Sequence, residues 1–174
     1  DPGYVWPEQG QKTAILNVTD GISTERRYQV MPYINQSGLW AVQHSYIADW
    51  QFHDLNQNVG SPVAIPTGQW VKVKLYTRMN TPGAENGVVM LWIDDELKLN
   101  YDNVNIRENT DYGFGKLIMG SYATPSSGSD GFEWFDGWVL SLSDPEWIAD
   151  EQPTEVPGAP SGVVRTDTKA PQGN

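Results

Sequence analysis

Apolar and polar residues alternate along residues 71–79, and this alternation constrains the fold more than any other feature of the sequence. The residues on one side are mostly apolar and those on the other are all polar: Val71, Val73, Leu75, Thr77 and Met79 against Lys72, Lys74, Tyr76 and Arg78. A period of two is typical of a β-strand that has one face on a core and the other toward solvent. The segment therefore predicts a half-buried strand.

Strand patterns recur through the chain, whereas no stretch shows the i, i+3, i+4, i+7 apolar pattern of a capped helix. Short alternating or apolar runs are separated by turns rich in Gly, Pro, Asn or Asp. The expected strands cover residues 12–19, 26–34, 40–47, 68–80, 88–93, 117–122 and 132–142. Strands of this length and spacing predict an all-β protein, a two-sheet antiparallel jelly-roll sandwich.

The composition changes after residue 150. Residues 151–174 contain four Pro and no aromatic residue, so they cannot bury enough apolar surface to form a core. We expect one domain over residues 1–150, followed by an irregular Pro-rich tail or linker over 151–174. If the tail is ordered, a neighbouring subunit or the flank of the domain would have to hold it, so we expect a protein partner or homo-oligomer contact there.

Charge and composition exclude several classes of protein. The chain has 174 residues, and 22 Asp and Glu against 11 Lys and Arg give a net charge of −11, which argues against nucleic-acid binding. The absence of Cys excludes disulfides and thiolate chemistry. No apolar run approaches the roughly 20 residues of a membrane helix. With two His, a metal would be a hard cation such as a structural Ca²⁺, with Asp94, Asp95 and Asp136 as candidate oxygen ligands.

Tryptophan and tyrosine are unusually frequent, at eight each against four Phe. Their rings combine an apolar face with a polar edge, which suits flat polar ligands as well as cores. Trp70 and Trp92 lie in strand patterns, and we assign them to the core. Trp40 and Trp50 lie beside polar residues, and we expect them to be exposed and to stack on pyranose rings.

Residues 68–95 resemble a segment of concanavalin A-like jelly rolls. They read G-Q-W-V-K-V-K-L-Y-T-R-M-N, then T-P-G, N-G and V-V-M-L-W-I-D-D, and residues 132–141 (F-E-W-F-D-G-W-V-L-S) resemble the closing strand of such folds. The segment is similar to that of heparin-lyase-like and alginate-lyase-like polysaccharide lyases and related carbohydrate-binding modules. Where that pattern has Asp-Gly after Trp92, this chain has Asp94-Asp95, and Asp is one of the few residues that tolerates a positive φ.

The resemblance implies a sheet face that holds sugars. A lyase of this kind acts by β-elimination, in which a cation or amide neutralises a uronate carboxylate and a base removes the adjacent proton. The residues that could fill these roles are Arg27, Gln43, His44, Tyr46 and Tyr76. Gln43 and His44 are adjacent, so a regular strand would turn them to opposite faces.

Three functions remain open. We favour a non-catalytic glycan-binding module whose site consists of Arg27, Gln29, Trp40, His44, Tyr46, Trp50, Lys74, Tyr76 and Arg78. The second function is a polysaccharide lyase acting on a uronate polymer, which the net charge of −11 disfavours through long-range repulsion. The third is a structural virion-decoration, adhesin or assembly domain whose tail docks on a neighbouring subunit. We expect an extracellular or surface location, on a cell or a virion.

Overall fold

The computed structural model describes residues 11–19, 28–46, 51–66, 69–123 and 140. Within these residues it has eight β-strands and no helix. The tail, residues 151–174, and the expected strand 132–142 apart from residue 140 lie outside them. None of the described segments is a helix of the length and apolar character needed to cross a membrane.

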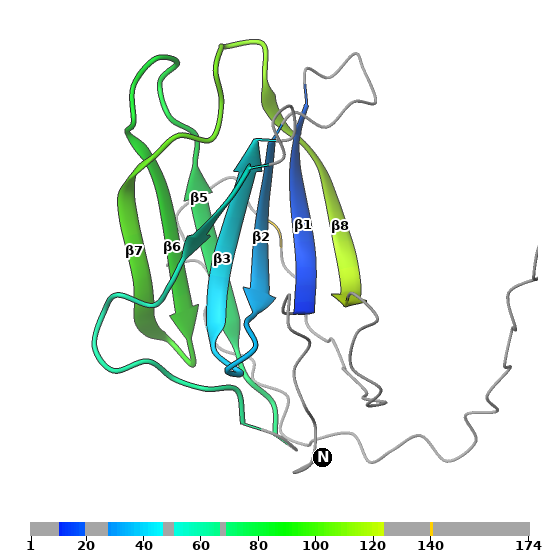
Figure 1. The fold of residues 1–174 in the computed structure, drawn as a ribbon, viewed down its shortest axis with the longest axis vertical. Coiled ribbons are helices and arrows are strands. Elements are labelled where there is room, and N and C mark those ends of the chain that lie inside the picture. Colours follow the sequence, from blue (N-terminus) through cyan, green and yellow to red (C-terminus); the bar gives the residue numbers. More distant parts are fainter. Residues whose placement is uncertain (1–10, 20–27, 47–50, 67–68, 124–139, 141–174) are drawn as a thin grey trace, which may run out of the picture.

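The strands form two antiparallel sheets (Figure 1). The first sheet has the order β4-β3-β2-β1-β8 and consists of β1 (Gln11–Thr19), β2 (Tyr28–Ile34), β3 (Trp40–Tyr46), β4 (Gln51–Leu55) and β8 (Gly113–Ala123). The second has the order β5-β6-β7 and consists of β5 (Val73–Arg78), β6 (Gly87–Ile93) and β7 (Glu96–Val104). The predicted all-β sandwich of two antiparallel sheets is confirmed.

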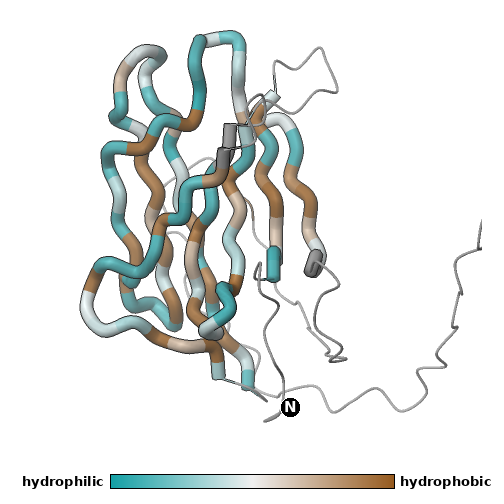
Figure 2. The backbone as a smooth tube through the Cα atoms, in the orientation of Figure 1, coloured by the Kyte–Doolittle hydropathy of each residue, from teal (hydrophilic) through white to brown (hydrophobic). Residues whose placement is uncertain are grey.

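The core lies between the two sheets, and its members alternate along the strands that contribute to it. Its buried members are Val18, Tyr28, Val30, Ile34, Trp40, Val42, Leu55, Val89, Leu91, Ile93, Leu99, Val104 and Ile106. Figure 2 shows the resulting change between hydrophobic and hydrophilic residues along the strands. Because successive side chains of a strand point to opposite faces, the residues between these core positions lie on the face turned away from the core. We call that face of the five-stranded sheet its outer face.

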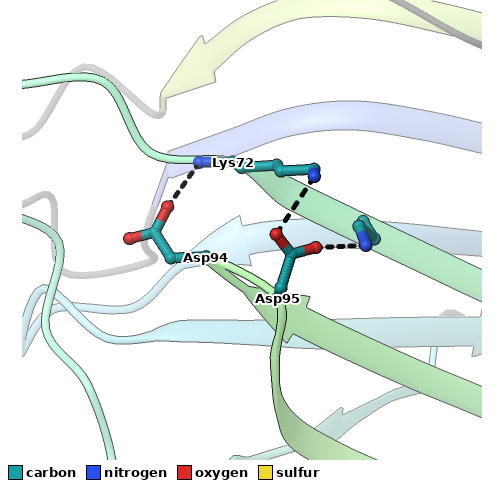
Figure 3. Close-up of polar contacts among 4 residues, drawn as sticks. Lys72, Asp94 and Asp95 are labelled. Carbon is teal, nitrogen blue, oxygen red and sulfur yellow. Dashed lines mark hydrogen bonds and ion pairs between the residues drawn. The ribbon is translucent and has the colours of Figure 1, made fainter. Parts of the chain in front are cut away.

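The β6–β7 hairpin closes with two aspartates in the left-handed region. Asp94 has a φ of 48° and Asp95 a φ of 66°, as a two-residue hairpin turn with both φ values positive requires. The Asp94 carboxylate accepts a hydrogen bond from the backbone N–H of Lys72 at 2.9 Å. The Asp95 carboxylate forms ion pairs with Lys72 and Lys74 (Figure 3). The Asp-Asp turn is thus accommodated in place of the Asp-Gly of the resembling segment.

The segment that leaves β4 is fastened to the edge of the second sheet. The Asn58 backbone N–H donates to the carbonyl oxygen of Lys98 at 2.9 Å. The Asn58 side chain exchanges two hydrogen bonds with the backbone of Asn100, both 2.8 Å long. These bonds link the edge strands β4 and β7 and hold β4 in place at the border of the first sheet.

Candidate functional site

Five side chains from four adjacent strands gather on the outer face of the five-stranded sheet. We call them the outer-face cluster: Lys12 on β1, Tyr33 on β2, Gln43 on β3, and Phe52 and Asp54 on β4. The chain neighbours of Tyr33, Gln43 and Asp54 include core residues, so alternation turns these three side chains away from the core. The cluster brings an amine, a phenol, an amide, a carboxylate and an aromatic ring together on one sheet face.

A β-bulge places Lys12 in this cluster. Leu16 pairs with Val30 and packs against the core, and a strict period of two from Leu16 would turn Lys12 toward the core as well. The register between β1 and β2 shifts by one residue between these positions, so that Lys12 pairs with Tyr33. The Lys12 ammonium then lies 5.3 Å from the centroid of the Phe52 ring on the outer face.

Asp54 holds two neighbours in the cluster. Its carboxylate accepts a hydrogen bond of 2.9 Å from the Gln43 amide, Nε2 to Oδ1. It also accepts a hydrogen bond from the Tyr33 phenol. Asp54 is exposed, whereas the Tyr33 side chain is buried. Asp54 therefore orients one amide and one phenol from two other strands.

The environment shifts the pKa values of Tyr33 and Lys12 in opposite directions. Burial, the negative charge of Asp54 and the hydrogen bond to Asp54 together raise the pKa of Tyr33 far above its usual range. Burial lowers the pKa of Lys12, because the charged ammonium loses solvation. The phenol consequently keeps its proton at alkaline pH, while Lys12 loses its proton more easily than an exposed lysine.

His44 lies on the other face of the same sheet, as the alternation of the strand predicted. It pairs with His53 on β4, and the two imidazole rings stack with centroids 5.0 Å apart. Gln43 meanwhile bonds to Asp54 on the outer face. The sequence-based prediction that Gln43 and His44 do not line one cleft is confirmed.

Several side chains assigned to the glycan-binding groove lie elsewhere. Trp40 has 8 % of its surface exposed and belongs to the core, so the prediction of an exposed stacking ring is wrong for this residue. Trp40 occupies an inward position of β3, like Val42 two residues later. The polar residues near it in the sequence led to the expectation that it is exposed. Gln29 is on the outer face but buried, and its amide donates to Asn17 at 2.8 Å.

Lys74, Tyr76 and Arg78 belong to the second sheet. The alternation predicted for this strand is confirmed, because Val73 and Leu75 pack against the core. The three polar residues therefore point away from the core on a different layer from Gln43 and cannot join the outer-face cluster. Trp92 is also turned outward, paired in register with Lys74, so its assignment to the core is wrong.

The remaining sequence-based predictions stay predictions. Arg27, Trp50 and Asp136 lie outside the described residues, as does the tail with its expected partner. Tyr46 is placed by its backbone, which pairs with Tyr28 and Gln51. The described residues contain no group of three or more His, Asp or Glu that could hold a metal. The structural Ca²⁺ was expected to use Asp136 as well, and it too stays a prediction.

Sequence reasoning missed Lys12, Tyr33, Phe52 and Asp54. Residues 51–55 were not expected to form a strand. The sequence analysis therefore did not include β4, the strand that pairs with β3 at the edge of the first sheet. The signal was the short Gln-Phe-His-Asp-Leu alternation, five residues long. Lys12 could not have been placed from a period of two, because the bulge in β1 reverses its face.

Part of the chain matches a known protein family. A family model described as Polysaccharide lyase 14 matches residues 28–130, more than half of the chain. The matched region begins at β2 and includes Tyr33, Gln43, Phe52 and Asp54 but not Lys12. No curated protein and no solved structure matches the chain.

Proposed function

The chain belongs to the polysaccharide lyase 14 family, and from this premise we propose that it cleaves a uronate polymer by β-elimination at the outer-face cluster. The observation that carries the proposal is the meeting of Lys12 and Tyr33 on one sheet face with their pKa values shifted in opposite directions. Paired titratable groups separated in this way are typical of acid–base catalysis.

The reaction needs three functions from the protein. A base takes the C5 proton of the uronate, the electron pair of that C–H bond forms the C4=C5 double bond, and the C4–O4 bond breaks. The departing O4 atom takes up a proton from an acid. A hydrogen-bond donor or cation at the carboxylate stabilises the negative charge that develops there.

The outer-face cluster can supply each function. Lys12 is the base, because its lowered pKa increases the fraction of neutral amine. Tyr33 is the acid, because its raised pKa keeps the phenol protonated. Gln43 uses one hydrogen of its amide on Asp54 and has a second for the substrate carboxylate. Asp54 is a positioning residue that orients Tyr33 and Gln43.

Glycan binding without catalysis is the second candidate. Two observations favour it: the net charge of −11 and the exposed Asp54 carboxylate inside the cluster both repel a uronate polymer. On this alternative the same face would hold a neutral polysaccharide through Gln43 and Phe52. The expected extracellular or surface location belongs to both proposals.

The experiment incubates the full chain with alginate, glucuronan and a neutral glucan, and follows the ultraviolet absorbance of the new conjugated double bond. Tyr33→Phe and Lys12→Ala should each lower kcat by roughly 10²- to 10⁴-fold, the usual contribution of an acid or base. The matched controls are Tyr76→Phe and Lys74→Ala, both on the second sheet; both should keep full activity.

The comparison of uronate polymers with a neutral glucan also separates the two candidate functions. No absorbance on any uronate polymer, together with retardation of the protein in a gel containing neutral glucan, would establish binding and reject the lyase. Equal activity of Tyr33→Phe and the wild type would reject the outer-face cluster as the active site.

A further inference from the structure

Phe52 is an aromatic ring with a large exposed surface beside the proposed acid–base groups. Its exposed fraction is 43 %, although apolar side chains of this size are usually buried. It lies on the same strand and the same face as Asp54, two residues away. At about 3.3 Å per residue the two α-carbons are roughly 7 Å apart, so the ring and the carboxylate are close neighbours on the sheet.

The ring has one contact on the face of the sheet. Lys12 reaches from β1 and places its amino nitrogen 5.3 Å from the ring centroid. This contact involves one side of the ring, and 43 % of the residue stays exposed. The exposed part of the ring is thus available to stack on a ligand.

A pyranose ring has a face of C–H groups that packs on an aromatic plane, and a uronate adds a carboxylate at its edge. The Phe52 ring offers the apolar plane, and it is exposed on the same face as the proposed acid–base groups. Lys12 is the neutral base of the proposed reaction, so it does not serve as a cation for the carboxylate. The preference of the subsite for a uronate therefore rests on the proposed function.

We propose that Phe52 forms a sugar-binding subsite next to the Tyr33–Asp54 pair, where its ring stacks on a uronate unit adjacent to the bond that is cleaved. This proposal rests on the proposed function, because the polysaccharide bound at the subsite is the substrate that is cleaved on the same sheet face. Phe52 contributes to holding the polymer and not to proton transfer. Phe52 therefore contributes to the affinity for longer polysaccharides, which extend past the cleaved bond and reach the ring.

The test compares Phe52→Ala, Phe52→Trp and the wild type on alginate and glucuronan. Phe52→Ala should raise KM about 2- to 10-fold, in line with the usual contribution of an aromatic stacking contact, with little change in kcat. Phe52→Trp keeps a stacking plane and should restore the KM. The matched control is Phe114→Ala, because Phe114 has a similar exposed fraction, 38 %, on β8.

Affinity electrophoresis in the same polymers gives a second readout that does not depend on turnover. Phe52→Ala should migrate faster than the wild type, while Phe114→Ala should not. If the wild type is retarded but never active, a loss of retardation in Phe52→Ala supports the subsite and rejects the lyase. If the wild type is active and Phe52→Ala keeps its KM and its retardation, the subsite is overturned and the lyase stands. A wild type that is neither active nor retarded overturns both.

Discussion

The imidazole rings of His44 and His53 stack across β3 and β4, with 24° between their planes. The two residues are direct partners in the register, and His44 faces the core side of the sheet. Burial, followed by the positive charge of His53, lowers the pKa of His44 to about 4, while Asp54 acts in the opposite direction. Protonation of His44 is therefore coupled to unfolding.

We predict that the protein loses stability as the pH falls from about 6.5 to about 4. The unfolded chain protonates His44 near pH 6.5, whereas the folded chain does so only near pH 4. The unfolded state binds more protons in this window, so the free energy of unfolding decreases with decreasing pH. The loss is complete below about pH 4 and is on the order of 3 kcal/mol. Urea unfolding at a series of pH values measures it.

The matched variants are His44→Gln and His53→Gln. The first should flatten the pH dependence in this window, and the second should flatten it only in part, because the charge of His53 is the smaller cause. Asp95 and Glu96 have pKa values lowered by neighbouring lysines, and they titrate in all three proteins. An unchanged slope in His44→Gln would contradict the prediction.

Activity should be greatest at alkaline pH. The proposed base Lys12 must be neutral and the proposed acid Tyr33 protonated, so turnover should rise above the lowered pKa of Lys12 and fall above the raised pKa of Tyr33. Replacing Asp54 by Asn removes a charge and an acceptor that raise the pKa of Tyr33. The alkaline limb of kcat/KM should then move to lower pH in Asp54→Asn. An alkaline limb that stays in place would contradict the contribution of Asp54 to the raised pKa of Tyr33.

Gly87, the first residue of β6, lies close to the backbone of both neighbouring strands. A Cβ added there would overlap the carbonyl oxygen of Val104 and lie 3.2 Å from the carbonyl oxygen of Arg78. These are backbone atoms of both adjacent strands and cannot move aside independently. Gly87→Ala should destabilise the protein by about 1–3 kcal/mol or more. Gly113→Ala is the control, since an added Cβ there meets nothing within 4 Å, and a similar loss in both variants would refute the explanation.

Much of the fold could be predicted because strand alternation is a local property. The pattern of residues 71–79 and the apolar run of 88–93 became β5 and β6, and their inward residues were those expected for β5. Trp92 was misplaced because a run that is apolar on both faces has no visible alternation. Its face is decided by register with β5, which pairs it with Lys74.

The candidate site could not be predicted, because it depends on register between strands far apart in the sequence. Lys12 and Phe52 are 40 positions apart in the chain. The strand order β4-β3-β2-β1 and the bulge in β1 bring them together. Tyr33 carried no local sign of a special role either. Its raised pKa arises from burial and from Asp54, both of which are tertiary effects.

Asn80 joins the end of β5 to the segment after β7. It is fully buried, and its side-chain oxygen accepts backbone N–H bonds from Ile106 at 2.7 Å and Arg107 at 2.8 Å. Asn80→Ala leaves both donors without this acceptor and should cost about 2–4 kcal/mol in the free energy of unfolding. Asn103→Ala, at an exposed position of β7, should change it by less than about 0.5 kcal/mol. Equal losses in chemical denaturation would argue against this role for Asn80.

The last prediction concerns the positive φ of Asp95, 66°. Replacement by Ala or by Gly removes the carboxylate equally, so the difference between the two variants reports on the backbone alone. A residue with a Cβ costs about 1–2 kcal/mol in this conformation, and Asp95→Gly should therefore be more stable than Asp95→Ala by about that amount. At Glu96, the first residue of β7, the order should reverse, because Gly weakens a strand relative to Ala. Thermal unfolding of the four variants measures these differences. A melting temperature of Asp95→Ala equal to or above that of Asp95→Gly would contradict the turn geometry.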